Sequence, residues 1–239
     1  MENRPKECMA CIIDNLLYYG NIMPAFSEKF LSNLGIKSIV CLLSKNIKLV
    51  HSKEFSVLDI ITDDLVTCSI NEWAEKTSDF IDESINNNNP VYVHCYQGIS
   101  RSTACVLHYL MTKRKMNLKD SFSLVKSKRK VACPNIGFFK DLVDLDKKLY
   151  GTNSMTLKEY SIMAISENFP TLDKEEIENT YNKYYELYTN GEKKDEYKKE
   201  METNGYEPIG YHTLDELKEG IGKDKFIPRK GTSVHHPFN

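Results

Sequence analysis

Cys95 and Arg101 are the residues best suited to chemistry in this 239-residue chain, and five residues separate them. A short β-branched and aromatic run, 90–93, precedes them, and the helical pattern of 103–111 follows. A loop between a strand and a helix turns backbone N–H groups and the positive helix N-terminus toward a bound anion, and Arg101 adds a planar fork for two oxygens. The same environment favours the thiolate of Cys95, so the pattern predicts a nucleophile aimed at phosphorus.

Two further residues of the loop support this prediction. Gly98 lies where the chain must turn sharply and let a phosphate approach the backbone. Ser102 follows Arg101 and can donate a hydrogen bond to the sulfur, which would help the thiolate leave when a phospho-enzyme is hydrolysed. The alternative, a buried inert cysteine at a strand end, is common for free cysteines. The residues predicted to line the phosphate site are Tyr96, Gln97, Gly98, Ile99, Ser100 and Arg101.

A thiolate nucleophile also needs an acid that protonates the leaving oxygen. Three carboxylates, Asp59, Asp63 and Asp64, lie at or after the strand-like run 55–60, and the carboxyl ends of strands are where open α/β sheets place their sites. Asp64, 31 positions before Cys95 (95 − 64), is the predicted general acid. Asp63 remains an alternative, and carboxylates in such a loop can simply be solvated.

Residues from about 8 to 149 resemble the dual-specificity protein phosphatases, most nearly the MAP-kinase-phosphatase-like branch. Six further segments carry the resemblance in order, namely 15–20, 34–40, Trp73, 79–82, 109–111 and 134–138. The resemblance implies that Cys95 forms a cysteinyl-phosphate and that Arg101 clamps the phosphoryl group without a metal or cofactor. Asp64, nine positions before Trp73, stands where the family keeps its general acid and base.

The resemblance also bears on the substrate. The family's shallow pocket implies phosphoserine and phosphothreonine as substrates alongside phosphotyrosine, with a phosphorylated MAP kinase as one expected partner. Gln97 replaces the family's usual small residue, which leaves the preference among these open. Arg129, in the basic cluster 126–130, is the counterpart of an arginine that holds a second phosphate or an acidic residue of the substrate. The alternative for Arg129 is a solvated helix end, where cations are favoured.

Alternating strand and helix patterns predict an α/β phosphatase fold, with a central, mostly parallel sheet flanked by helices. The expected strands lie near 10–13, 16–19, 38–43, 55–60 and 91–95. The expected helices lie near 24–34, 70–86, 101–115, 118–129, 136–150, 156–168 and 173–189. We expect a catalytic domain over 8–150 and a mainly helical, partly irregular C-terminal extension over 151–239, whose apolar and aromatic face suits a protein partner.

Composition excludes several other classes of protein. No apolar run is long enough to span a bilayer, and the net charge of −2 with no basic aromatic stripe argues against nucleic acid. The chain has seven cysteines, of which Cys8 and Cys11 form a Cys-x2-Cys pair with no second pair to complete a zinc site, so no metal site is predicted. The odd number of cysteines favours a reducing compartment, the cytoplasm or the nucleus. Two alternatives to a protein phosphatase stay open: a phosphate-binding scaffold with little activity, and a phosphatase of a non-protein substrate such as a phosphoinositide.

Overall fold

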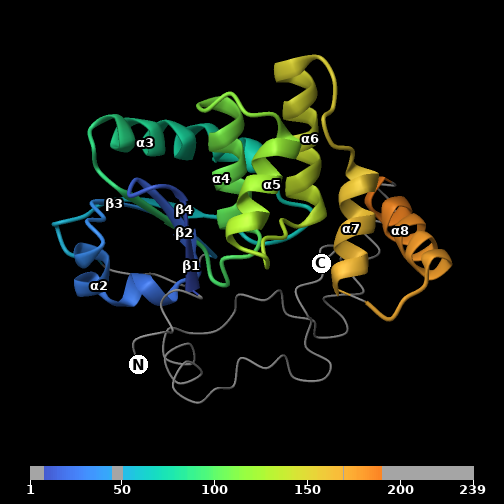
Figure 1. Ribbon diagram of the computed structural model, residues 1–239, viewed down its shortest axis with the longest axis horizontal. Coiled ribbons are helices and arrows are strands. Elements are labelled where there is room, and N and C mark those ends of the chain that lie inside the picture. Colours follow the sequence, from blue (N-terminus) through green and yellow to red (C-terminus); the bar gives the residue numbers. More distant parts are fainter. Residues whose placement is uncertain (1–7, 45–50, 169, 190–239) are drawn as a thin grey trace.

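The computed structural model describes residues 8–44, 51–168 and 170–189, and its centre is a five-stranded sheet in the order β1-β2-β5-β3-β4 (Figure 1). Only the β1–β2 pair is antiparallel, while β2–β5, β5–β3 and β3–β4 are parallel, so the predicted mostly parallel sheet is confirmed. The strands are β1 Met9–Ile13, β2 Leu17–Gly20, β3 Ser38–Leu43, β4 Ser56–Ile61 and β5 Val91–His94.

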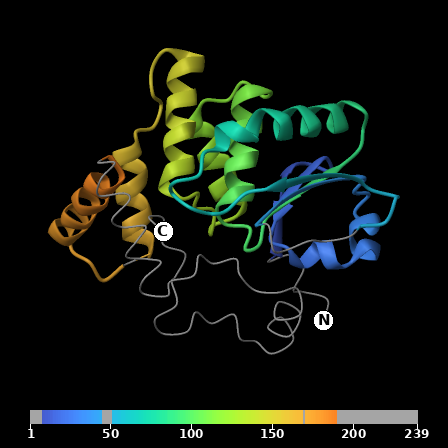
Figure 2. The same ribbon diagram turned by 180° about the vertical axis from the view of Figure 1, so that it is seen from behind.

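Helices cover both faces of this sheet (Figures 1 and 2). The short α2 (Glu28–Asn33) lies on one face, and its buried Leu31 shares a core cluster with Ile39 and Tyr92. Their neighbours Val40 and Val93 point into the main core on the other face, as the two-residue period of a strand requires. That second face carries α3 (Ala74–Asn86), α4 (Arg101–Thr112), α5 (Leu118–Lys128) and α6 (Ile136–Tyr150).

Three helices differ from the sequence expectation. The helix expected over 24–34 is divided into a 3-10 turn, η1 (Met23–Phe26), and α2, because Ser27 leaves the helical conformation and its hydroxyl accepts the N–H of Phe30. A second turn, η2 (Ile70–Glu72), precedes α3. Helix α4 ends at Thr112 rather than 115, where Lys115 adopts a left-handed φ of 59°.

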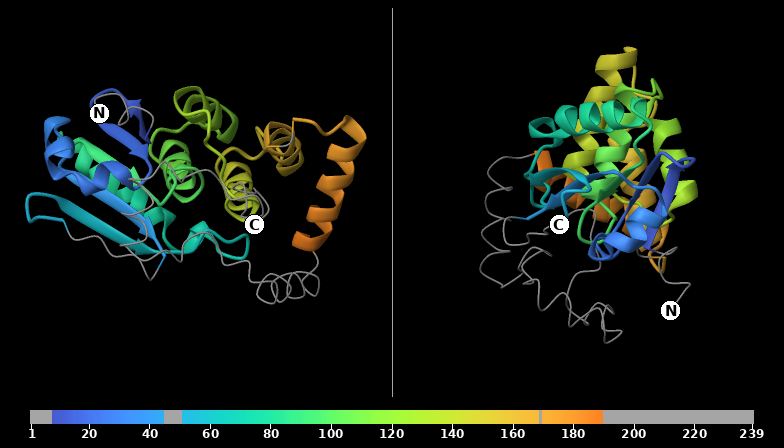
Figure 3. Two further views of the ribbon diagram at one scale, coloured as in Figure 1. Left: turned by 90° about the horizontal axis from the view of Figure 1, so that it is seen from below. Right: turned by 90° about the vertical axis from the view of Figure 1, so that its left-hand side faces the viewer.

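The C-terminal extension continues the same core. Gly151 ends α6 with a left-handed φ of 80°, and α7 (Leu157–Asn168) then places the fully buried Tyr160 and Ala164 in the main cluster. Helix α8 (Lys174–Thr189) lies beside α7, as Figure 3 shows from below, and its Tyr181 shares a core cluster with Ile165 of α7. The boundary at 150/151 stays a prediction, and the expected irregular part of the extension, 190–239, lies outside the described residues. No helix in the described ranges is both long and apolar enough to span a bilayer.

Candidate active site

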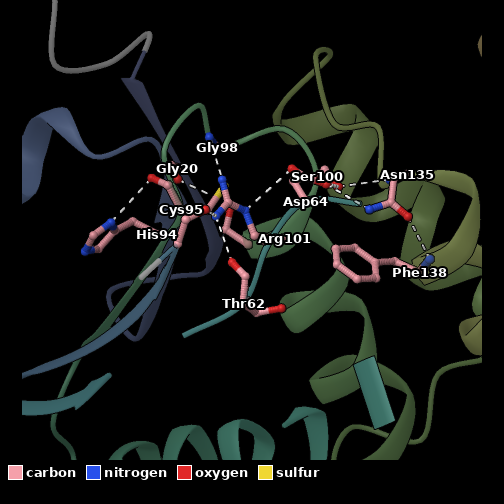
Figure 4. Close-up of polar contacts among 12 residues, drawn as sticks. Gly20, Thr62, Asp64, His94, Cys95, Gly98, Ser100, Arg101, Asn135 and Phe138 are labelled. Carbon is pink, nitrogen blue, oxygen red and sulfur yellow. Dashed lines mark hydrogen bonds and ion pairs between the residues drawn. The ribbon is translucent and has the colours of Figure 1, made fainter. Parts of the chain in front are cut away.

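The predicted phosphate loop joins β5 to α4 at the carboxyl end of the parallel strands (Figure 4). His94 at the end of β5 is in register with Gly20 of β2 on one side and with Cys41 of β3 on the other. The loop therefore leaves the middle of the sheet, between two strands that fix its origin. It enters α4 directly at Arg101, so the helix N-terminus faces the same space.

The Cys95 side chain is 1% exposed and surrounded by hydrogen-bond donors. The backbone N–H of Gly98 donates to Cys95 Sγ at 3.2 Å, and Ser102 Oγ lies 3.3 Å from the same sulfur. Both groups lie within hydrogen-bond distance of the sulfur. The structure thus brings together Cys95, Gly98 and Ser102, as the sequence predicted.

Gly98 is the residue that allows the loop to turn so tightly. Its φ is +69°, and a Cβ built on it would lie 2.3 Å from the carbonyl carbon of Gly20 and 2.4 Å from the nitrogen of Asn21. The backbone of the loop therefore packs directly on the end of β2, where any side chain would collide. This close approach is what turns the Gly98 N–H toward the sulfur.

Arg101 is buried, with 2% of its surface exposed, and it joins the loop to the ends of two other strands. Its Nη1 donates to the carbonyl of Thr62 at 3.0 Å, just after β4, and to Ser44 Oγ at 3.4 Å, just after β3. Its Nε lies 3.6 Å from Asp64 Oδ2. The guanidinium is thus held beside both the loop and the predicted acid.

Asp64 is the carboxylate that the fold brings to the loop. Its Oδ1 accepts hydrogen bonds from Ser100 Oγ and, at 2.8 Å, from Asn135 Nδ2. Asp63, its neighbour, is partly exposed, and Asp59 lies on β4 opposite Cys41. Among the three predicted carboxylates, Asp64 alone makes hydrogen bonds to the phosphate-loop network in the part of the chain that the structure describes.

Sequence reasoning missed Asn135, which organises this corner of the site. Its Oδ1 accepts the N–H of Phe138 and so caps α6, its Nδ2 holds Asp64, and its own N–H donates to Ser100 Oγ at 2.9 Å. The available signal was an asparagine directly before a helical pattern, which predicts the cap but not the two contacts across the chain.

The segment that carries Asp64 is anchored on α6. Asp141 Oδ2 accepts hydrogen bonds from Ser69 Oγ and from the N–H of Ile70, at 2.7 and 2.9 Å. The ring of Trp73 meets that of Phe138 edge-on, with 6.0 Å between centroids. Trp73, whose position nine residues after Asp64 pointed to the acid, thus also packs on α6 and supports the segment that carries Asp64.

Three of the predicted substrate-binding residues, Arg129, Tyr96 and Ile99, make contacts within the protein. Arg129 Nε donates to the carbonyl of Gly98 at 2.8 Å and its Nη2 donates to the carbonyl of Gln97 at 3.3 Å, so the side chain braces the loop. Tyr96 is buried beside Ile22, and Ile99 packs against the main core. Tyr96 and Ile99 can therefore serve the site through their backbone N–H groups.

His94, which precedes the nucleophile, is held neutral. Complete burial lowers its pKa to about 3. Its ring stacks on Tyr92, with 5.6 Å between centroids, and its Nδ1 lies 3.4 Å from the carbonyl of Cys95. The imidazole thus acts as a packed element beneath the loop and adds no charge to the site.

Comparison with known proteins agrees with this geometry. A family model described as "Dual specificity phosphatase, catalytic domain" matches residues 17–148, more than half of the chain. The chain therefore belongs to the dual specificity phosphatase family, and it carries that family's catalytic domain.

Individual relatives cover the same part of the chain. A protein of Invertebrate iridescent virus 6, named as a candidate tyrosine phosphatase, 123R, is 36% identical over 60% of this chain and 95% of its own length. Dual specificity protein phosphatase 1 of Arabidopsis thaliana is 33% identical over 58% of this chain and 69% of its own.

A solved structure gives the same result. The human tyrosine phosphatase-like serine/threonine/tyrosine-interacting protein has a TM-score of 0.55 and 30% identity, over 59% of this chain and 96% of that one. The α/β phosphatase fold predicted from the sequence is thereby confirmed.

Proposed function

We propose that this protein hydrolyses phosphotyrosine and phosphoserine or phosphothreonine in proteins through a cysteinyl-phosphate intermediate. One observation carries the proposal: hydrogen bonds and one ion pair join the Cys95 loop, Arg101 and Asp64. Nucleophile, cation and acid thus lie together at the N-terminus of α4, as phosphoryl transfer requires.

In the first step, Cys95 Sγ attacks phosphorus, so an S–P bond forms while the P–O bond to the substrate breaks. Arg101 and the inward N–H groups of the loop take up the charge of the equatorial oxygens. Asp64 donates its proton to the leaving oxygen. Its Oδ1 accepts hydrogen bonds from Ser100 and Asn135, so we assign the proton to Oδ2, which lies 3.6 Å from Arg101 Nε.

In the second step, water attacks the cysteinyl-phosphate and the S–P bond breaks. Asp64, now a carboxylate, accepts a proton from that water. The departing thiolate receives hydrogen bonds from the N–H of Gly98 and from Ser102 Oγ, which lie 3.2 and 3.3 Å from the sulfur. These donors lower the barrier for sulfur to leave.

The proposed substrates are phosphorylated signalling proteins, MAP-kinase-like proteins among them, in the cytoplasm or nucleus. The names of relatives such as human dual specificity protein phosphatase 1 support the dual specificity, although the chain spans 36% of that protein. The seven cysteines are all free, which suits a reducing compartment.

The test is phosphate release by the wild type from a fixed panel, with Cys95→Ser as the blank. The panel holds phosphotyrosine, phosphothreonine and doubly phosphorylated Thr-x-Tyr peptides, together with a phosphoinositide. We expect Cys95-dependent release from both kinds of peptide. Release from the lipid alone would replace the substrate class.

A binding protein on the same fold is the second candidate, since one structure similar to this chain is described as phosphatase-like and as an interacting protein. It predicts that the wild type binds the phosphopeptides of the panel and releases no phosphate beyond the Cys95→Ser blank. Calorimetric titration with the same peptides distinguishes the two candidates.

A further inference from the structure

The segment 129–135, here called the strap, runs from the end of α5 to the cap of α6 and follows the phosphate loop. Besides the contacts of Arg129, the N–H of Cys133 donates to the carbonyl of Ile99 at 2.9 Å. At the far end, Asn135 bonds to Ser100 and to Asp64. The strap thus contacts the loop at both ends and in the middle, and it is in direct contact with the predicted acid.

Helix α7 supports the other side of the strap, although it lies beyond residues 17–148, which match the family model. The hydroxyl of Tyr160 donates to the carbonyl of Pro134, directly before Asn135. The same hydroxyl lies 3.4 Å from Cys133 Sγ. The Tyr160 ring is fully buried and stacks on Phe139, with 3.5 Å between ring centroids and 4° between planes.

A second contact from α7 reaches the strap through a lysine of α5. Lys126 Nζ donates to the carbonyl of Ala132 at 3.0 Å and forms an ion pair with Glu167 of α7 at 2.6 Å. Glu167 is 45% exposed, so this pair is screened by water and weaker than the buried contact of Tyr160.

We propose that Tyr160 is a positioning residue of the active site, which sets Asp64 and the phosphate loop through Pro134 and Asn135. The inference rests on the proposed function, because the group that Tyr160 positions, the carboxyl of Asp64, is the proton donor in that function. The carbonyl of Pro134 is fixed by the Tyr160 hydroxyl, and this fixes the peptide unit whose N–H, that of Asn135, reaches Ser100. Residues outside the family's matched region thereby complete its catalytic apparatus.

The kinetic test uses Tyr160→Phe, which keeps the stacked ring and removes only the hydroxyl. Tyr109→Phe is the matched control, because Tyr109 is also fully buried in the main core. Substrates are aryl phosphates whose leaving groups range from acidic to weakly acidic phenols. For the weakly acidic phenols, which depend on a proton donor, we expect Tyr160→Phe to lower kcat/KM about two- to tenfold, because kcat/KM reports the first step, in which the leaving oxygen is protonated.

For acidic leaving groups the same variant should approach the wild-type kcat/KM, so the dependence of log kcat/KM on leaving-group pKa becomes steeper. A purely structural role predicts an equal loss for all substrates, and that result would overturn the proposal. So would wild-type kinetics in Tyr160→Phe, or the same change of slope in Tyr109→Phe.

Hydrogen exchange provides a readout that does not depend on catalysis. In Tyr160→Phe we expect faster exchange at two amides: the N–H of Cys133, which donates to the carbonyl of Ile99, and the N–H of Gly98, which donates to Cys95 Sγ. Exchange in the β3–β4 pair should be unchanged. This result supports the inference even if the wild type shows no Cys95-dependent release, an outcome that would reject the proposed function alone. Unchanged exchange at both amides would reject the inference.

Discussion

A methyl group at Gly98 tests whether the packing of the phosphate loop on β2 is what makes the site. The substitution Gly98→Ala has two separable effects. Alanine at a φ of +69° adds the usual left-handed penalty of about 1–2 kcal/mol. The methyl group would also lie 2.3 Å from the carbonyl carbon of Gly20.

The collision of the methyl group with Gly20 determines how much activity Gly98→Ala should lose. Carbon atoms approach favourably to about 3.5 Å, so the loop or the end of β2 must move by about 1 Å. The Gly98 N–H that donates to Cys95 Sγ moves with the loop. Since a displacement of about 1 Å at a reacting group can reduce a rate about 100-fold, we expect kcat/KM of Gly98→Ala to fall by that order.

Gly151→Ala is the control, because Gly151 has a similar φ of +80° and nothing within 4 Å of the added Cβ. It should be destabilised by about 1–2 kcal/mol and keep its activity. The assays are urea unfolding, phosphate release and competitive inhibition by tungstate, whose affinity reports the loop directly. If Gly98→Ala keeps kcat/KM and tungstate affinity within about threefold of Gly151→Ala, the argument from loop packing is refuted.

Three further predictions concern the acid, the brace and the buried histidine. Asp64→Asn keeps the acceptor for Ser100 and Asn135 but cannot transfer a proton, so kcat/KM for weakly acidic leaving groups should fall about 100- to 10,000-fold, whereas Asp63→Asn should keep wild-type values; the reverse order would assign the acid to Asp63. Arg129→Ala removes two hydrogen bonds to loop carbonyls, so it should lower kcat/KM equally for singly and doubly phosphorylated peptides; a loss confined to the doubly phosphorylated peptide would instead show a substrate contact. His94 has a pKa of about 3 in the folded state, so between pH 7 and pH 5 only the unfolded chain gains its proton, and the free energy of unfolding should fall by about 2 kcal/mol on this account. Urea unfolding of His94→Gln at both pH values should show a correspondingly smaller decrease, and an equal decrease would contradict the assignment.

The local pattern of the sequence was sufficient to locate the nucleophile loop and most elements. Cys95, Arg101 and Ser102 lie within eight consecutive residues, so a strand, a turn and a helix place them together with no distant partner. Helices and strands were predictable for the same reason, since each period depends on neighbouring residues. Where a single residue interrupted a period, as Ser27 does before α2, the boundary was missed.

Contacts between distant segments needed the tertiary structure. The sequence favoured Asp64 over Asp63 by its spacing to Trp73, whereas the hydrogen bonds that hold Asp64 beside the loop come from Ser100 and Asn135, 36 and 71 positions away in the sequence. The sequence pattern also did not predict the two hydrogen bonds from Arg129 to loop carbonyls, 31 and 32 positions away, and its expected contact with the substrate stays a prediction.

The contribution of Tyr160 also depended on the tertiary structure. A tyrosine in a helical pattern indicates only an apolar face, and nothing in the spacing relates α7 to the strap. The sequence by itself thus determined the nucleophile and the phosphate-binding residues of the proposed chemistry, because Cys95, Arg101 and Ser102 are neighbours along the chain. The packing of α6 and α7 against the loop decided how those groups are held, because these supports join residues that only folding brings within hydrogen-bond distance.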